Sequence, residues 1–142
     1  GDAVNYYNMP TYMRQAIKDG ADFTTPEGET IPNCRLTKDA DPSRSYAYCS
    51  DTLPCPDNCE YIKGVDLLYH EATFADSEQA RAKSTHHSTA REAAKIAKEA
   101  GAKRLAIGHY SSRYDDSRIL QQEANEVFPG TECADEGMVF SI

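Results

Sequence analysis

Acidic and imidazole side chains stand at the ends of three short apolar runs in this sequence: Asp51, His70 with Glu71, and His109. Asp51 and His109 are candidate metal ligands, because carboxylate oxygen and imidazole nitrogen both bind zinc at about 2.0–2.2 Å. A single such residue at a strand end is more commonly a cap or a hydrogen-bonded turn residue. The recurrence after three successive runs is what favours a shared site.

The three runs are predicted strands, since residues 45–49, 65–69 and 104–108 are rich in apolar and aromatic side chains and end in polar ones. Strands that alternate with helices are typical of an α/β layer, in which the loops that carry function meet at one edge of the sheet. We therefore expect the polar residues after the three runs to converge.

The clearest helix spans residues 90–100, where Thr89 is the predicted N-cap, Glu92 completes a capping box and Gly101 ends the helix. Its alanines form a small-residue face suited to close packing.

A last helix is predicted from a cap at Asp116 or Ser117 to about Phe128. Residues 132–134 and 138–142 flank a turn, and they are expected to close the chain as an edge hairpin or as paired short strands. Residues 1–45 are rich in turn-forming residues, which predicts an irregular opening segment with one short helix near 11–18.

Size and charge restrict the class of protein. A chain of 142 residues fits one ordinary domain, and with a mean hydropathy of -0.68 it has no apolar run approaching a membrane span, so no membrane partner is expected.

The net charge of -8 is not that of an obvious nucleic-acid binder. Residues 81–113, however, hold eight bases against two acids, a local net charge of +6. Such a window is either a solvated helix face with paired charges or an electropositive zone near the chemistry.

The five cysteines are an odd set without a secretory signal, which indicates reduced thiols and a cytoplasmic protein. Cys55 and Cys59 form one loose pair near Cys49, but a structural zinc site needs four ligands. A zinc site in this loop is therefore not predicted.

Four sequence blocks together resemble a known family: Ser50-Asp51-Thr52, His70-Glu71-Ala72-Thr73-Phe74, His87-Ser88-Thr89 and residues 108–114. Their order and spacing are similar to those of ribonuclease Z, the tRNA 3′-processing endoribonuclease branch of the metallo-β-lactamase superfamily. The resemblance runs from about Tyr46 to Phe128. It implies that residues 46–142 form half of an αββα sandwich, an α/β fold with one mostly β layer and helices packed on one face.

The resemblance also implies a dinuclear zinc site, in which Asp51 bridges both ions, His109 binds one, and a bridging water attacks the phosphodiester. His70 would then lie beside the scissile phosphate as a proton donor or phosphate ligand. His87 would support it from the neighbouring loop, and Glu71 would tune its orientation.

Ser111 and Arg113 would hold nearby phosphates, because a guanidinium can bond two phosphate oxygens at once. The basic residues of the window 81–113 would then serve to bind RNA. His86 lies outside the matching blocks and is interpreted as a solvent-facing neighbour of His87.

The metal-binding His-x-His-x-Asp-His block of the family is absent, and four histidines cannot supply its usual set of five histidines and two aspartates. We therefore expect the chain to be the C-terminal half of such an enzyme, inactive alone and binding zinc weakly. The expected partners are precursor tRNA, the missing N-terminal half and a second copy of the intact protein.

Two other interpretations remain open. The same scaffold could hydrolyse a small ester, lactone or sulfate, because one fold hosts many chemistries. Alternatively, the chain could be a non-enzymatic interaction half whose exposed apolar face packs on another sheet.

Overall fold

The computed structural model describes residues 9–142. The chain divides into two compact units, Gly1–Pro42 and Ser43–Ile142, each of which is described by itself.

The N-terminal unit contains more regular structure than the expected short helix. Its elements are helix α1 (Thr11–Lys18), an antiparallel pair of strands β1 (Phe23–Thr24) and β2 (Thr30–Ile31), and helix α2 (Asn33–Leu36). The turn-forming residues of this segment reverse the chain between the two strands, where Gly28 adopts φ 90°. The Asn33 side chain then ties the unit together, donating to the carbonyl oxygens of Ile17 at 2.6 Å and Ala21 at 2.9 Å.

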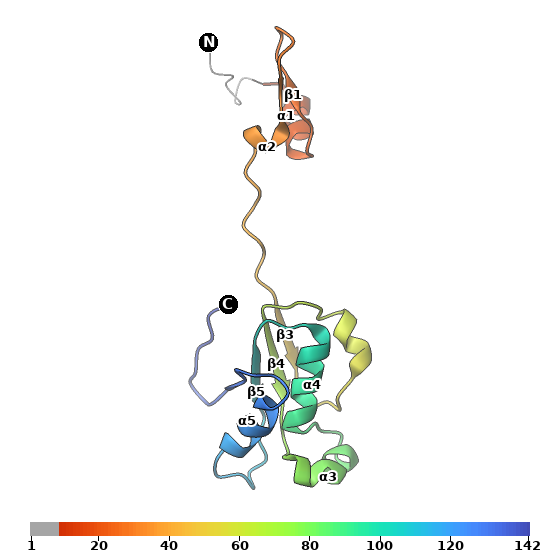
Figure 1. The fold of residues 1–142 in the computed structure, drawn as a ribbon, viewed down its shortest axis with the longest axis vertical. Helices are drawn as coiled ribbons and strands as arrows, with labels where there is room; N and C mark the ends of the chain where they lie inside the picture. The colour runs from red at the N-terminus through yellow and green to blue at the C-terminus, as the bar shows by residue number, and fades with distance from the viewer. Residues whose placement is uncertain (1–8) are drawn as a thin grey trace. The chain divides into compact units, whose positions relative to one another are not determined.

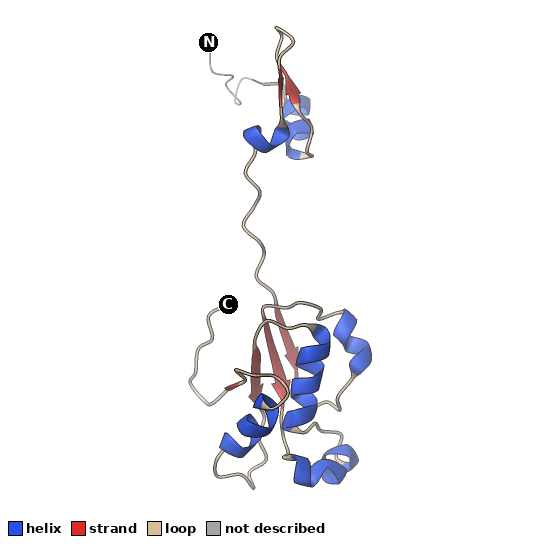
Figure 2. Cartoon of the chain, viewed as in Figure 1, coloured by secondary structure: helices blue, strands red, loops and turns tan. Residues whose placement is uncertain are grey.

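The C-terminal unit is built on a four-stranded sheet in the order β3-β4-β5-β6 (Figures 1 and 2). The strands are β3 (Tyr46–Cys49), β4 (Leu67–Glu71), β5 (Leu105–Gly108) and β6 (Glu132–Cys133). All three neighbouring pairs are parallel, so the carboxyl ends of the strands lie at the same edge of the sheet.

The helices of this unit are α3 (Gln79–Ser84), α4 (Ala90–Ala100) and α5 (Arg118–Asn125). Helices α4 and α5 pack on each other and on one face of the sheet (Figure 1), where Leu68, Leu105 and Ile107 are fully buried. The expected α/β fold, with helices on one face of a β layer, is confirmed. Within residues 9–142, no helix is both long and apolar enough to cross a membrane.

Helix α4 has the predicted ends. The Thr89 hydroxyl accepts from the backbone N–H of Glu92 at 3.2 Å, and the Glu92 carboxylate accepts from the backbone N–H of Thr89 at 2.9 Å. Gly101 ends the helix in the left-handed region, at φ 65°. This reciprocal cap fixes the position of the loop that precedes the helix.

The prediction for the last helix is only partly right. α5 begins at Arg118, whose backbone N–H donates to the Asp116 carboxylate at 2.9 Å, but it ends at Asn125 rather than near Phe128.

The predicted terminal hairpin is wrong. β6 pairs in parallel with β5 at the sheet edge, and residues 138–142 form no strand. Side chains bind this tail instead: Arg104 donates to the Ser141 carbonyl oxygen and Arg44 to that of Ile142, each at 2.6 Å. Arginine contacts therefore replace the backbone pairing that a hairpin would supply.

Candidate active site

Three strands deliver polar residues to one edge of the sheet. Asp51 lies two residues beyond β3, Glu71 is the last residue of β4, and His109 follows β5 directly. Because the strands are parallel, these positions meet at the carboxyl edge, where α/β sheets place their sites. The expected convergence of Asp51 and His109 is confirmed, since Asp51 Oδ1 lies 3.3 Å from His109 Nε2.

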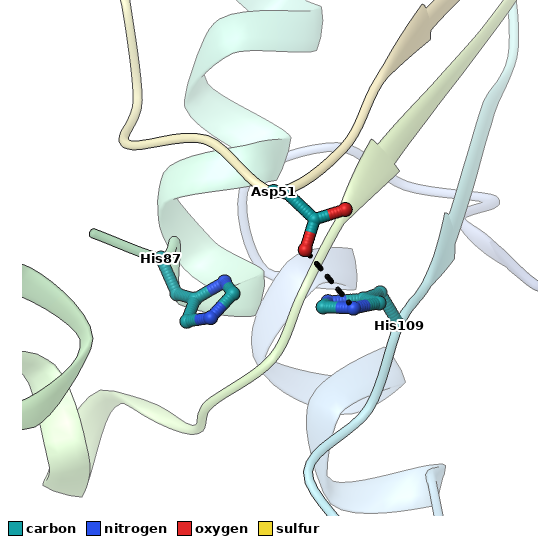
Figure 3. A group of neighbouring side chains, drawn as sticks. All are labelled: Asp51, His87 and His109. Atoms are coloured by element: carbon teal, nitrogen blue, oxygen red, sulfur yellow. Dashed lines mark ion pairs between the residues drawn. The ribbon is translucent and has the colours of Figure 1, made fainter. Parts of the chain in front are cut away.

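Asp51 and His109 are joined by His87, whose side chain turns toward them from the loop before α4 (Figure 3). One potential ligand atom from each of these residues lies within 4.8 Å of the other two, the only such group of three among residues 9–142. Two ligands about 2.1 Å from a tetrahedral ion lie about 3.4 Å apart, close to the Asp51–His109 spacing. The geometry of this pair therefore suits a shared metal ion.

The backbone at these two positions is strained. Asp51 has φ 50° and His109 has φ 60°, in the left-handed region that residues other than glycine seldom adopt. His86 shares this conformation at φ 63°, but it is an exposed turn residue outside the group of three, in agreement with its expected role as a neighbour. Strain of this kind gathers where the surrounding structure holds a functional geometry.

The Glu71 carboxylate connects the parts of the site. It is fully buried and accepts four hydrogen bonds, from the backbone N–H groups of Thr52 (2.6 Å) and Ser88 (3.0 Å), the Thr73 hydroxyl (2.7 Å) and His87 Nδ1 (2.9 Å). Burial by itself raises the pKa of Glu71, but the four hydrogen bonds outweigh burial and bring the pKa below its usual value. Glu71 is therefore a buried carboxylate that stays ionised.

The hydrogen bonds around Glu71 determine which ring nitrogens of His87 and His109 remain available to bind a ligand or a proton. Because a carboxylate only accepts, His87 Nδ1 carries a proton and its Nε2 faces away from Glu71. The Thr73 hydroxyl donates to Glu71, so its oxygen accepts from His109 Nδ1 at 3.0 Å. The lone pair of neutral His109 then sits on Nε2, facing the Asp51 carboxylate, and a cation between the two would stabilise this arrangement.

His70 does not join the group of three. Alternation along β4 places it on the same face as Leu68, under the helices, and its side chain is 1% exposed. Its Nδ1 lies 2.8 Å from the Glu71 carbonyl oxygen, and burial lowers its pKa, which favours the neutral ring. The position of His70 therefore does not support a role beside the scissile phosphate, and the imidazole that reaches the other two ligands is that of His87.

Ser111 and Arg113 lie in the loop that follows β5. Arg113 donates to the Ser111 hydroxyl and to the Glu78 carboxylate, each at 3.1 Å, and its guanidinium lies 5.1 Å from the centroid of the Phe74 ring. The guanidinium is held in place, but its charge is balanced by Glu78.

Ion pairs neutralise four of the eight basic side chains in the window 81–113. Arg91 pairs with Asp76 and Glu126, Lys103 with Asp66, Arg104 with Glu132, and Arg113 with Glu78. The other four bases form no ion pair within the described part of the chain: Arg81, Lys83, Lys95 and Lys98.

All five cysteines are free thiols. Within residues 9–142, Cys49, Cys55 and Cys59 are not part of the group of side chains that could hold a metal ion. Burial raises the pKa of the Cys49 and Cys59 thiols, which keeps both protonated at neutral pH.

Comparisons with known proteins identify the family of the chain. Residues 13–110 match a family model described as the beta-lactamase superfamily domain. The chain is 55% identical to a ribonuclease Z from Bacteroides fragilis and 57% identical to one from Parabacteroides distasonis, each alignment covering 99% of this chain and 46% of the relative. The resemblance stated from the four sequence blocks is thereby confirmed, and the chain spans about half the length of these curated relatives.

A solved structure supports the fold. The metallo-beta-lactamase fold protein YhfI from Bacillus subtilis is 28% identical and aligns with a TM-score of 0.55, covering 68% of this chain and 37% of that one. The coverage shows again that these relatives are longer than the chain.

Proposed function

The chain belongs to the beta-lactamase superfamily, and from this premise we propose that it supplies part of the active site of a metal-dependent endoribonuclease that removes 3′ trailers from tRNA precursors. The observation that carries the proposal is the pairing of buried Glu71 with His87 beside Asp51 and His109. The identity to ribonuclease Z relatives over nearly the whole chain supports the choice of substrate.

Asp51 and His109 would hold the metal, with the remaining ligands coming from outside this chain. Zinc bound there would supply charge stabilisation at the phosphate and lower the pKa of a water nucleophile. Thr73 holds His109 through Nδ1, so the ring presents Nε2 toward Asp51. This contact keeps Nε2, the nitrogen that would bind the metal, directed toward Asp51.

His87 would be the proton donor to the leaving oxygen. Glu71 accepts a hydrogen bond from His87 Nδ1 and fixes the ring, which leaves Nε2 as the nitrogen that would face the leaving oxygen. Cleavage that leaves a 3′-hydroxyl on the tRNA releases a 3′-oxygen, and this oxygen needs the proton. His87 would thus take the role that the resemblance implied for His70.

The test uses a polypeptide that contains this chain and has the full length of the ribonuclease Z relatives, called here the full-length polypeptide. Loaded with zinc, it should cut a 3′-extended tRNA, leaving a 3′-hydroxyl on the tRNA and a 5′-phosphate on the trailer. Asp51→Ala should abolish cleavage and lower the zinc content measured after dialysis. Hydrolysis of small esters or sulfates without any cleavage of the RNA would contradict the proposal.

Several properties of the intact protein are proposed with the activity. The five free thiols support a reducing compartment such as the cytoplasm, and the carboxylate and imidazole ligands support zinc. The chain alone should bind zinc weakly, because two ligands leave tetrahedral positions to solvent. The N-terminal part of the polypeptide would complete the site, and the intact protein would form a homodimer.

Glu78→Gln is expected to strengthen RNA binding if Arg113 contacts a phosphate. The substitution removes the carboxylate that now balances the guanidinium, so Arg113 becomes free to bond phosphate oxygens. For the full-length polypeptide, KM for trailer RNA should fall about two- to fivefold, with a steeper dependence on salt. Glu126→Gln, which removes a carboxylate from Arg91 instead, is the matched control. An unchanged or higher KM in Glu78→Gln would show that Arg113 does not bind substrate.

A further inference from the structure

A cavity of about 510 Å³ opens beside His87. Its walls come from the segment after Asp51, from α3, from the loop before α4 and from α4 itself: Leu53, Pro54, Gln79, Ala80, Lys83, His87 and Glu92. The volume lies within the range of about 300–1,000 Å³ that is typical of small-molecule sites. We propose that this cavity binds one nucleotide of the RNA strand, next to the bond that is cut; this inference rests on the proposed function.

The cavity shares one residue with the group of three potential ligands. His87 belongs to both, and Leu53 and Pro54 follow Asp51 by two and three residues along the same loop. A strand whose phosphate lies at Asp51 and His109 would therefore place an adjoining nucleotide within reach of the cavity.

One side of the cavity is apolar, and the opposite edge can form hydrogen bonds. Leu53, Pro54 and Ala80 offer a surface against which the flat face of a base can pack. Gln79 Nε2 donates to Glu92 Oε1 at 3.2 Å, which fixes the amide and leaves Gln79 Oε1 free to accept from a base edge. The Glu92 carboxylate would repel a phosphate at this edge, so the edge suits a base.

Lys83 provides the charge for a phosphate. It is exposed, forms no ion pair within residues 9–142, and is the one member of the four unpaired bases that lines the cavity. An apolar wall, a fixed amide and a free ammonium together match the base and the phosphate of one nucleotide.

The test uses the full-length polypeptide and two readouts, cleavage of trailer RNA and binding of an eight-nucleotide single-stranded RNA followed by fluorescence anisotropy. Ala80→Trp fills the cavity from an exposed helical position and should lower RNA affinity and raise KM at least tenfold, with kcat within about threefold. Ala80→Ser, which adds little volume, is its control.

Lys83→Ala should weaken binding and reduce the slope of log affinity against log salt by about 0.7, the value for one phosphate contact on a single strand. Lys98→Ala, the same change at an exposed and unpaired lysine of α4, should leave both quantities within twofold of wild type.

The outcomes separate this inference from the proposed function. If the wild type cuts trailer RNA but Ala80→Trp keeps the wild-type KM, the cavity is not a nucleotide site although the activity is right. If the wild type does not cut, the proposed function fails, and the anisotropy measurement still decides the cavity. Equal losses in Lys83→Ala and Lys98→Ala would overturn the assignment of Lys83, because they would indicate charge attraction without a defined contact.

Discussion

Glu71→Gln is expected to destabilise the C-terminal unit by about 3–5 kcal/mol at neutral pH, the range for breaking a buried charged network by changing one partner. Four donors converge on the two oxygens of this carboxylate. An amide turns one of those oxygens into a donor that faces other donors, leaving buried hydrogen bonds unmade. Urea denaturation of both proteins at pH 7 measures the difference. Glu132→Gln, at a half-exposed ion pair with Arg104, should cost no more than about 1 kcal/mol.

The effect of Glu71→Gln should depend on pH in one direction. Because the pKa of Glu71 is lower in the folded protein than its usual value of 4.5, ionised Glu71 stabilises the fold above that value. This stabilisation disappears as the pH falls through the lower folded-state pKa. The difference between wild type and variant should therefore shrink below about pH 4.5. An equal difference at pH 3 and pH 7 would show that ionisation of Glu71 does not hold the loop.

The second large effect is expected at His87. In the full-length polypeptide, His87→Asn should lower kcat for trailer RNA by about 10²–10⁴, the usual contribution of a positioned acid. His87 is the imidazole that combines a fixed Nδ1 proton with a partly exposed ring beside Asp51 and His109. Steady-state kinetics and a denaturation curve on the same variant separate lost chemistry from lost folding.

A substrate whose 3′ leaving oxygen is replaced by sulfur provides the control for His87→Asn. A thiolate leaves without protonation, so this substrate should be cut at nearly the same rate by wild type and variant. His70→Asn alters a buried ring under the helices, and sulfur in the substrate should not restore the activity that this variant loses. Rescue of His70→Asn, with no rescue of His87→Asn, would return the role of proton donor to His70.

The parts of the site that the sequence predicts are those set by local structure. Asp51 and His109 follow short apolar runs, and a parallel sheet brings the ends of such runs together. The cap of α4 is likewise local, since Thr89 and Glu92 satisfy each other within one turn. The cap needs no distant contact, and the convergence needs only the general rule that parallel strands end at the same edge of a sheet.

The different positions of His70 and His87 could not be predicted from local sequence alone. Adjacent residues of a strand face opposite sides, so only one of His70 and Glu71 could point into the site. Leu67 and Leu68 are both apolar and both buried, so the pattern of β4 gave no signal for which one. The position of His87 depends on distant pairing: Phe74 bridges to Thr89, and Ser88 donates its N–H to Glu71. No spacing within the sequence specifies those contacts.

The left-handed backbone at Asp51 and His109 sets the stability of the fold against the proposed metal binding at the same two positions. Glycine would suit either backbone better and would relieve about 1 kcal/mol or more of strain, yet it would remove a ligand. Selection for fold stability alone would therefore favour glycine at these two positions.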